Sequence, residues 1–451
     1  MVFLAGGDFS ENPPPRITHE ADRRLYVHLV RTTIRHLRLL DEIARLFSGR
    51  GHQELDRPVR ALVLLGLAQL RFLDKVAAYA AVNETVEAAG FLRAGRAKGW
   101  LNGVLRKAER ELKPGPFSPG REKPGDEGTG GEGKWWPQEA SFSLAIRTSH
   151  PDWLIARWEK QFGREAAEGI SLANNRYEGV TLRVETTRVT PENLARQLEG
   201  QAIHTEPHPL LEGALRSGQT LGLLASRPFQ DGLFYVQDVS SQVLMGWVAG
   251  LLKGKVLDAC AAPGGKLTLL AGRGAAGLEL TGMDLHPGRL ADIWVNQNRL
   301  GVPHTPLAAG DGARLPVSSG CLDGVLLDVP CSSTGMIRKY PELKWRKVEA
   351  DLARYSLLQE KMVLEAGRVL KPGGVMVYMT CSLETEENQG VVNRFLTENK
   401  EFTRISFREV PPPPGLKADP AGLITGEGDF QMIPGQDRMG LYGALIKKNE
   451  V

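Results

Sequence analysis

The feature that most constrains the fold is a repeated alternation that begins at Gly254. Short apolar runs that end in Asp or Gly alternate there with longer stretches of helical periodicity, and this pattern predicts βαβ units around a parallel sheet. Ligands of open parallel sheets bind at the carboxyl ends of the strands, so the residues that follow each run are the first candidates for a functional site. The four runs are Lys255–Leu257, Leu280–Met283, Gly324–Leu327 and Gly374–Met379.

The length of 451 residues predicts about two to four domains, because a single hydrophobic core rarely grows to that size. An apolar content of 42% and a charged content of 24% are those of a globular protein, and no apolar run is long enough to cross a bilayer. The segment Met1–Ser10 lacks the basic flank and apolar core of an export signal. We therefore expect no membrane partner and a cytoplasmic location. The net charge of +3 is too small to indicate a nucleic-acid partner by itself.

The N-terminal region predicts an all-α domain, because its apolar residues recur at three- and four-residue steps over Leu25–Phe47, Val59–Leu73, Val82–Ala89 and Lys98–Leu112. Its C-terminal part is strongly basic. This segment either binds phosphates or forms a solvated helix face, and charge alone does not choose between the two. The basic residues are Arg93, Arg96, Lys98, Arg106, Lys107, Arg110 and Lys113.

These patterns predict the domain organisation. Residues 1–112 form the helical domain, and residues 113–137, which are rich in Gly, Pro and charge, form a flexible linker. A strand over Val180–Val184 and a helix over Pro191–Leu198 place a small α+β domain at residues 138–235. The parallel sheet then belongs to a domain at residues 236–451.

The four cysteines, Cys260, Cys321, Cys331 and Cys381, form no CxxC pair, and no His lies at metal-ligand spacing. We therefore expect neither a disulfide framework nor a metal site. A free cysteine is either core filler or a nucleophile, and filler explains most single cases. Cys331 and Cys381, however, follow two of the apolar runs, so both are expected at the edge of the sheet where a ligand binds.

The stretch from Val256 to Leu267 combines a strand, a Pro-Gly-Gly turn and a helix, which lets a ligand approach the backbone. It is neither GxGxxG nor a P-loop, and this disfavours a dinucleotide or ATP. Asp284 ends the next run, about 20 residues later, where ribose hydroxyls are commonly bound. Asp311 follows the next connection and can reach an adenine edge. Taken singly, both acids also suit helix caps or turns.

Asp328, Cys331 and Cys381 together suit methylation of cytosine at C5. That carbon is a poor nucleophile, and a thiolate that adds to the neighbouring C6 makes it reactive. An acid near N3 of the ring, here Asp328, stabilises the adduct, and a second cysteine helps to release the enzyme by elimination. The residues alone do not decide which cysteine attacks, because Pro330-Cys331 also matches the Pro-Cys nucleophile of DNA cytosine methyltransferases.

At this point the chain closely resembles a known family, the RNA cytosine-C5 methyltransferases of the RsmB type, also called Sun or Fmu. The resemblance lies in Asp258–Lys266, Leu327–Gly335 and Thr380–Leu383, followed by Glu387 and Asn388. It implies a Rossmann-like S-adenosylmethionine-dependent methyltransferase domain, with Cys381 as the nucleophile, Cys331 in product release and no metal. The cofactor residues that it implies are Cys260, Ala261, Ala262, Pro263, Gly264, Gly265, Lys266, Asp284, Asp311 and Asp328.

The helical domain resembles the RNA-binding NusB fold through Arg60–Gln69, Ala81–Glu84 and Leu101–Arg106. The resemblance of this domain implies 16S ribosomal RNA as the partner and favours phosphate binding by the basic segment. Separately, we expect the protein to be a monomer. The rival hypotheses are a non-catalytic RNA-binding factor, a cytosine-C5 methyltransferase for another RNA, and a dehydrogenase.

The chain departs from the family at four sites. Met1–Arg16 replaces a first helix, Leu267 replaces the usual Thr, Ser333 the usual Gly, and Glu185 a frequent Asn.

Overall fold

The computed structural model describes residues 17, 19–112, 141–176, 179–218, 222–274 and 277–450. The predicted linker at residues 113–137, which includes Lys113, and the segment Met1–Arg16 lie outside these described residues. The chain divides into two compact units, one of Met1–Tyr177 with Ile337–Lys347 and one of Glu178–Met336 with Val348–Val451. Across the described ranges, no helix has both the length and the apolar character of a membrane span.

The first unit is helical, as the periodicity predicts. Its core joins apolar faces that include Leu40, Leu64 and Leu105. Where the sequence predicts one helix over Leu25–Phe47, the structure has two, because His36 leaves the helical conformation and stacks its buried ring on Phe72. The helices are α1 (Glu20–Arg35), α2 (Leu37–Ser48), α3 (Arg57–Phe72), α4 (Ala78–Phe91), α5 (Lys98–Glu111), α6 (Leu144–Arg147), α7 (Asp152–Phe162), α8 (Arg164–Asn175) and α14 (Leu343–Arg346).

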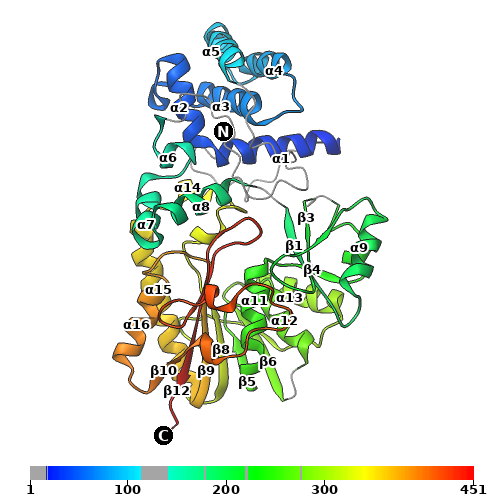
Figure 1. The fold of residues 1–451 in the computed structure, drawn as a ribbon, viewed down its shortest axis with the longest axis vertical. Coiled ribbons are helices and arrows are strands. Elements are labelled where there is room, and N and C mark those ends of the chain that lie inside the picture. The colour runs from blue at the N-terminus through cyan, green and yellow to red at the C-terminus, as the bar shows by residue number, and fades with distance from the viewer. Residues whose placement is uncertain are drawn as a thin grey trace. The chain divides into compact units, whose positions relative to one another are not determined.

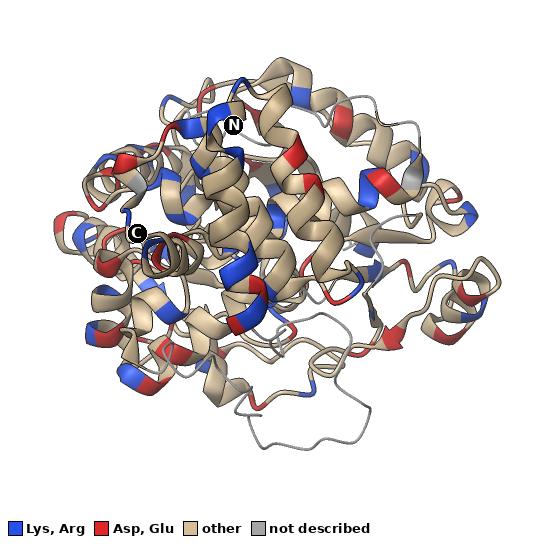
Figure 2. Cartoon of the chain, turned by 90° about the horizontal axis from the view of Figure 1, so that it is seen from above, with Lys and Arg blue, Asp and Glu red and all other residues tan. Residues whose placement is uncertain are grey.

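The basic segment at the end of this helical region is partly neutralised by its neighbours. Lys98 Nζ lies 2.7 Å from Glu87 Oε2, and Arg106 Nη1 lies 2.8 Å from Glu109 Oε2. Figure 2 shows the same mixture more widely, with basic and acidic residues interspersed on the helices in view. Surface pairs of this kind are worth only about 0–1 kcal/mol, so they leave the phosphate-binding hypothesis for this segment open.

The second unit opens with a small antiparallel sheet. Its strands lie in the order β2-β3-β1-β4, and α9 (Pro191–Glu199) packs on it through Leu194 and Leu198. The strand and the helix that the sequence predicts in this region are both present. The strands are β1 (Val180–Val184), β2 (Glu206–Pro207), β3 (Ala214–Ser217) and β4 (Phe234–Val236), and the short helix α10 (Arg227–Gln230) precedes β4.

The larger sheet has five parallel strands, which include all four predicted runs, and an antiparallel part that the sequence pattern did not predict. The strand order is β10-β12-β9-β8-β5-β6-β7, with β11 paired to β12. Strands β5 to β9 are mutually parallel, whereas β12 runs antiparallel to β9. The strands are β5 (Gly254–Asp258), β6 (Leu278–Asp284), β7 (Leu307–Ala309), β8 (Leu322–Asp328), β9 (Leu370–Thr380), β10 (Phe402–Ile405), β11 (Phe430–Met432) and β12 (Leu441–Lys448).

Helices cover both faces of this sheet (Figure 1). Successive strand residues alternate between two cores, so that Leu326 faces α11 (Val239–Val248), α12 (Gly265–Arg273) and α13 (Pro287–Leu300). Its neighbour Leu327 faces the helices α15 (Ala350–Val369) and α16 (Gln389–Glu398) on the other side. The strand order reverses at β5 and β8, and ligands of such sheets bind beside that point. The fold therefore places the candidate site at the carboxyl ends of these strands.

Candidate active site

The two cysteines that follow β8 and β9 meet at the carboxyl edge of the sheet. The strands are parallel neighbours, with Asp328 opposite Met379. Cys331 lies just beyond β8 and Cys381 just beyond β9, and their sulfur atoms are 3.1 Å apart. Both are free thiols; Cys331 is buried, whereas Cys381 is partly exposed. The sequence-based expectation that both face one edge therefore holds.

A buried carboxylate, Glu387, joins the two loops that carry these cysteines. Its Oε2 accepts a hydrogen bond from the backbone N–H of Ser332 at 2.8 Å, and its Oε1 accepts one from the Ser382 hydroxyl at 2.7 Å. Gln359 of α15 donates to the same carboxylate, and the hydroxyls of Ser332 and Ser382 lie 3.0 Å apart. Because Ser332 follows Cys331 and Ser382 follows Cys381, this network fixes the distance between the two thiols.

The hydrogen bonds of the site make the two thiols different acids. The hydrogen bond with Cys381, together with burial, raises the pKa of Cys331 well above its usual value. The hydrogen bond from Cys331 lowers the pKa of Cys381; burial opposes this effect and Ser333 supports it. Cys331 therefore keeps its proton more firmly than Cys381, and it is the donor of the pair whenever Cys381 is ionised. Since the thiolate is the nucleophilic form, Cys381 is the better placed of the two to attack a ligand.

An ion pair lies next to the thiols. The Lys266 ammonium, at the start of α12, contacts the Asp328 carboxylate at the end of β8. Burial alone would lower the pKa of Lys266, but Asp328 outweighs it and raises that pKa. Asp258, at the end of β5, is buried, and desolvation together with Asp328 raises its pKa to about 7. Chemically, the edge combines a thiol with a lowered pKa (Cys381), a thiol with a raised pKa (Cys331) and the Lys266–Asp328 ion pair.

Side chains hold the turn between β5 and α12 through its backbone carbonyls. The carbonyl of Ala262 accepts from Arg289, and that of Pro263 accepts from Asn296, both on α13. The next two carbonyls, of Gly264 and Gly265, accept from Thr268 and from Arg183. Four successive carbonyls are thus occupied. Gly264 has φ +100°, a conformation that favours glycine, and an added Cβ would lie 3.3 Å from Ile293.

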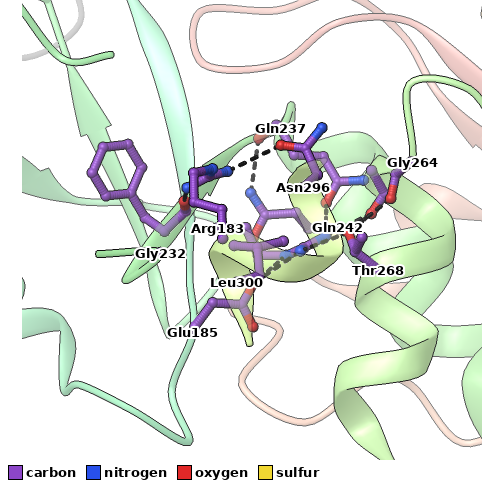
Figure 3. A network of polar contacts seen from close by, with 12 residues as sticks. Arg183, Glu185, Gly232, Gln237, Gln242, Gly264, Thr268, Asn296 and Leu300 are labelled. Carbon is purple, nitrogen blue, oxygen red and sulfur yellow. Dashed lines mark hydrogen bonds and ion pairs between the residues drawn. The ribbon is translucent and has the colours of Figure 1, made fainter. Parts of the chain in front are cut away.

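Arg183 reaches this turn from β1 of the small sheet (Figure 3). Its guanidinium donates to the Gly265 carbonyl at 2.6 Å and to the Gln237 side-chain oxygen at 2.9 Å. The same group pairs with Glu185 at 2.8 Å and donates to Thr268 at 3.2 Å. The side chain is only 8% exposed, so these bonds are shielded from water. The small sheet therefore supports the turn directly.

The other predicted site residues differ in exposure. The Asp284 carboxylate, at the end of β6, is buried and accepts hydrogen bonds from the backbone N–H groups of Ala262 and His286. Cys260 is partly exposed beside the turn, and burial raises the pKa of its thiol. Asp311 is exposed and accepts from the N–H of Ala313, as in a turn. Asp284 thus lies against the turn, whereas Asp311 has no such contact with it.

Three residues of this site were not predicted to have a role. Arg183 interrupts the apolar strand Val180–Val184, and a charged residue in an otherwise buried strand was a usable signal. Glu387 was noted only as part of a resemblance, and Ser333 only as a departure. The contacts of Glu387 and Ser333 join residues 55 and 48 positions apart, and those of Arg183 with the turn span 82 and 85 positions, which no local pattern reveals.

The fold and the site together define a class. A Rossmann-like domain with a Gly-rich turn after its first strand, and with paired thiols at the same edge, is a methyltransferase domain. Residues 251–447 match the family described as 16S rRNA methyltransferase RsmB/F. Residues 8–110 match the NusB family, and residues 150–221 match the ferredoxin-like domain of RsmF/B-like methyltransferases.

The relatives assign the family over almost the whole chain. The ribosomal RNA small subunit methyltransferase B of Salmonella arizonae is 31% identical, covering 99% of this chain and 96% of the relative. A probable enzyme of the same name from Synechocystis is 31% identical over 90% of this chain and 87% of the relative. The chain belongs to the RsmB family of RNA methyltransferases.

Solved structures share the fold. A methyltransferase homologue from Pyrococcus horikoshii is 25% identical with a TM-score of 0.53, covering 68% of this chain and 97% of the other. NSun6 from the same organism, solved with SFG, is 20% identical with a TM-score of 0.55, covering 67% of this chain and 99% of the other.

Proposed function

We propose that this enzyme methylates C5 of one cytosine in small-subunit ribosomal RNA, using S-adenosylmethionine and a covalent adduct between Cys381 and C6 of the base. The observation that carries the proposal is the pair of sulfur atoms 3.1 Å apart beside the Lys266–Asp328 ion pair. The alternative is Cys331 as the nucleophile, as in the Pro-Cys motif of DNA cytosine methyltransferases. It is disfavoured, because the hydrogen bond between the two cysteines lowers the pKa of Cys381 and raises the pKa of Cys331.

In this mechanism the Cys381 thiolate forms a bond to C6, and the negative charge moves into the ring toward N3 and C5. Asp328 stabilises that charge as the protonated acid, which donates to N3; it takes this proton from the Lys266 ammonium that it contacts, so that the ion pair becomes a neutral amine and a carboxylic acid. A positioned acid of this kind contributes on the order of 10² to 10⁴ in rate. Once C5 carries the methyl group, Cys331 takes the C5 proton as a thiolate, and the electron pair of that C–H bond re-forms the C5–C6 double bond and expels Cys381 as thiolate. Cys331 can first lose its own proton to water at this stage, because the Cys381 sulfur that raised its pKa is bonded to C6.

The proposed cofactor site is the turn Cys260–Lys266 with Asp284, Asp311 and Asp328. The turn fits such a ligand because four of its carbonyls already accept from side chains of the protein, so that the ligand does not have to satisfy them. Bound S-adenosylmethionine supplies an electrophilic methyl group. Asp284 is placed to accept from ribose hydroxyls, and the NSun6 structure with SFG, an analogue of this cofactor, supports the choice.

The substrate must present an unstacked base, because C5 of a paired cytosine cannot reach a sulfur at the sheet edge. Extrusion of a base costs a few kcal/mol, so the RNA has to be held elsewhere. The NusB-like helical region and the ferredoxin-like sheet are the proposed RNA contacts, and the names of the relatives make small-subunit ribosomal RNA the proposed partner. A cytoplasmic location is part of the same proposal.

The test is transfer of a tritiated methyl group to small-subunit ribosomal RNA, followed by bisulfite mapping of the modified base. We expect Cys381→Ala to reduce transfer by about 10³-fold or more while it keeps cofactor binding. Cys331→Ala should accumulate a protein–RNA adduct, seen as a retarded band on a denaturing gel. Cys321→Ala is the matched control, since the Cys321 thiol donates to Ser318 outside the site. An unmodified C5, or full transfer by Cys381→Ala, contradicts the proposal.

A further inference from the structure

Ser333 has an unfavourable backbone conformation in the loop that carries Cys331. Its φ is +62°, in the left-handed region where a Cβ collides with the backbone and where glycine is preferred. Of the non-glycine residues described with positive φ, namely Arg93, Ser149, Ala202 and Ser333, only Ser333 contacts the cysteine pair. Side chains kept in such conformations often serve the site in which they occur.

The Ser333 hydroxyl lies beside both thiols, and its oxygen accepts from the Cys381 thiol while that thiol is neutral. Its Oγ is 3.4 Å from Cys381 Sγ and 3.7 Å from Cys331 Sγ. It is also 3.4 Å from the backbone carbonyl of Cys331, which competes for the single hydroxyl proton. A thiolate accepts a charge-assisted hydrogen bond, which is stronger than a bond to a neutral carbonyl. When Cys381 is ionised, the hydroxyl therefore donates to the sulfur.

We propose that Ser333 is a further catalytic residue, whose hydroxyl joins the Cys331 thiol as a second hydrogen-bond donor to the Cys381 thiolate. The inference deepens the proposed function, since it rests on Cys381 being the nucleophile. A glycine or an alanine at position 333 cannot supply this donor. The unfavourable φ of Ser333 is then the cost of placing a hydroxyl beside the sulfur.

Other charges around Cys381 stay constant when only Ser333 is changed. The groups that act on Cys381 are Cys331, Asp328 and Lys266, and Glu387 acts on Cys331 from the adjoining network. None of these four contacts the Ser333 hydroxyl except Cys331. Loss of the hydroxyl therefore removes one donor without displacing a charged group.

The experiment measures the alkylation of Cys381 by iodoacetamide between pH 6 and pH 10, with peptide mass mapping of each cysteine. It uses Ser333→Ala, which keeps the unfavourable backbone, and Ser333→Gly, which relieves it. In both variants Cys381 should react about tenfold more slowly at pH 7 than in the unchanged protein, because loss of a donor raises the thiol pKa and lowers the fraction of thiolate. At pH 10 the rates should be equal, because the thiol is then ionised in all three proteins. The Gly variant alone should unfold at a higher temperature.

If Ser333→Ala alkylates at pH 7 like the unchanged protein, the hydroxyl has no role and the inference is overturned. If only Ser333→Gly is slower, the backbone and not the hydroxyl matters, and the inference is also overturned. Cys321 in the same digests is the internal reference for reagent and pH. Because alkylation needs neither RNA nor cofactor, an absence of methyl transfer would contradict the proposed function and leave this measurement interpretable.

Discussion

At the scale of single residues, the site depends on one buried carboxylate. Glu387 accepts from the Ser332 N–H, the Ser382 hydroxyl and the Gln359 amide, and it is 0% exposed. A donor left unsatisfied in the interior costs about 1–3 kcal/mol. The geometry of the two cysteines is thus maintained by a residue that touches neither sulfur.

Replacement of Glu387 by Ala should therefore destabilise the second unit by about 3 kcal/mol or more, since three buried donors lose their acceptor. Glu387→Gln keeps one acceptor oxygen and should cost less than half as much. The measurement is urea unfolding of both variants, read beside methyl transfer. Equal stability of the Ala variant and the unchanged protein would show that Glu387 does not maintain the cysteine geometry.

The sequence could identify the chemistry of these residues but not their states. Two cysteines at the ends of neighbouring parallel strands were predictable, because strand direction fixes the edge. Which of them ionises was not, since the answer depends on a 3.1 Å contact between residues 50 positions apart. From the sequence, only the resemblance favoured Cys381.

At the scale of secondary-structure elements, β1 and α12 are linked by Arg183. Gly265, whose carbonyl accepts from the guanidinium, packs closely on Tyr235, since an added Cβ would lie 3.1 Å from that ring. The same guanidinium lies 5.1 Å from the centre of the Tyr235 ring. Packing and hydrogen bonding thus fix the start of α12 from the small sheet.

We expect Arg183→Gln to raise the KM for S-adenosylmethionine about tenfold with little change in kcat, because the turn loses a charge-assisted hydrogen bond and not a reacting group. Arg183→Gln also leaves the Glu185 carboxylate without its ion-pair partner. The double variant Arg183→Gln with Glu185→Gln removes that unpaired charge, so any rise in KM that remains comes from the lost hydrogen bond to the turn. Arg216→Gln is the matched control, since Arg216 lies on β3 and pairs with Glu206 and Asp437. An unchanged KM in both Arg183 variants would contradict this role.

The elements themselves were largely predictable. All four apolar runs are strands of the parallel sheet, because a buried strand needs a continuous apolar run. The antiparallel strands β10 and β12 were not predicted, since β12 joins β9 only after more than 50 intervening residues. The break at His36 was hidden as well, because apolar spacing continues through it.

At the scale of the whole molecule, the most instructive feature is an eleven-residue excursion of the chain, Ile337–Lys347, into the helical unit. Lys344 is buried there, and its ammonium donates to the carbonyls of Arg35 and Ser149 and to the Asn175 side chain. The segment begins only six residues after Cys331. No sequence pattern indicated this excursion, because a lysine in a polar stretch is normally exposed.

Buried groups in the helical unit predict its response to acid. Burial lowers the pKa of His36 and of His150 well below 6.5, and Lys344 and Arg35 lower that of His36 further. The unfolded chain therefore binds more protons than the folded one once the pH falls below about 6.5. Stability from these neutral histidines is complete above that pH and is lost as the pH falls toward their folded pKa values.

We expect His36 and His150 to lower the free energy of unfolding of this unit by about 2.7 kcal/mol per pH unit below pH 6, since both take up protons on unfolding. His28, whose pKa burial also lowers, adds to this slope. The measurement is urea unfolding with amide hydrogen exchange in α3 peptides, compared between pH 5 and pH 8. The double variant His36→Phe with His150→Asn should lose most of this slope, and His204→Gln, an exposed histidine of the other unit, should keep it. The two replacements do not titrate. If the free energy of unfolding of the double variant falls with pH as steeply as that of the unchanged protein, other groups cause the effect.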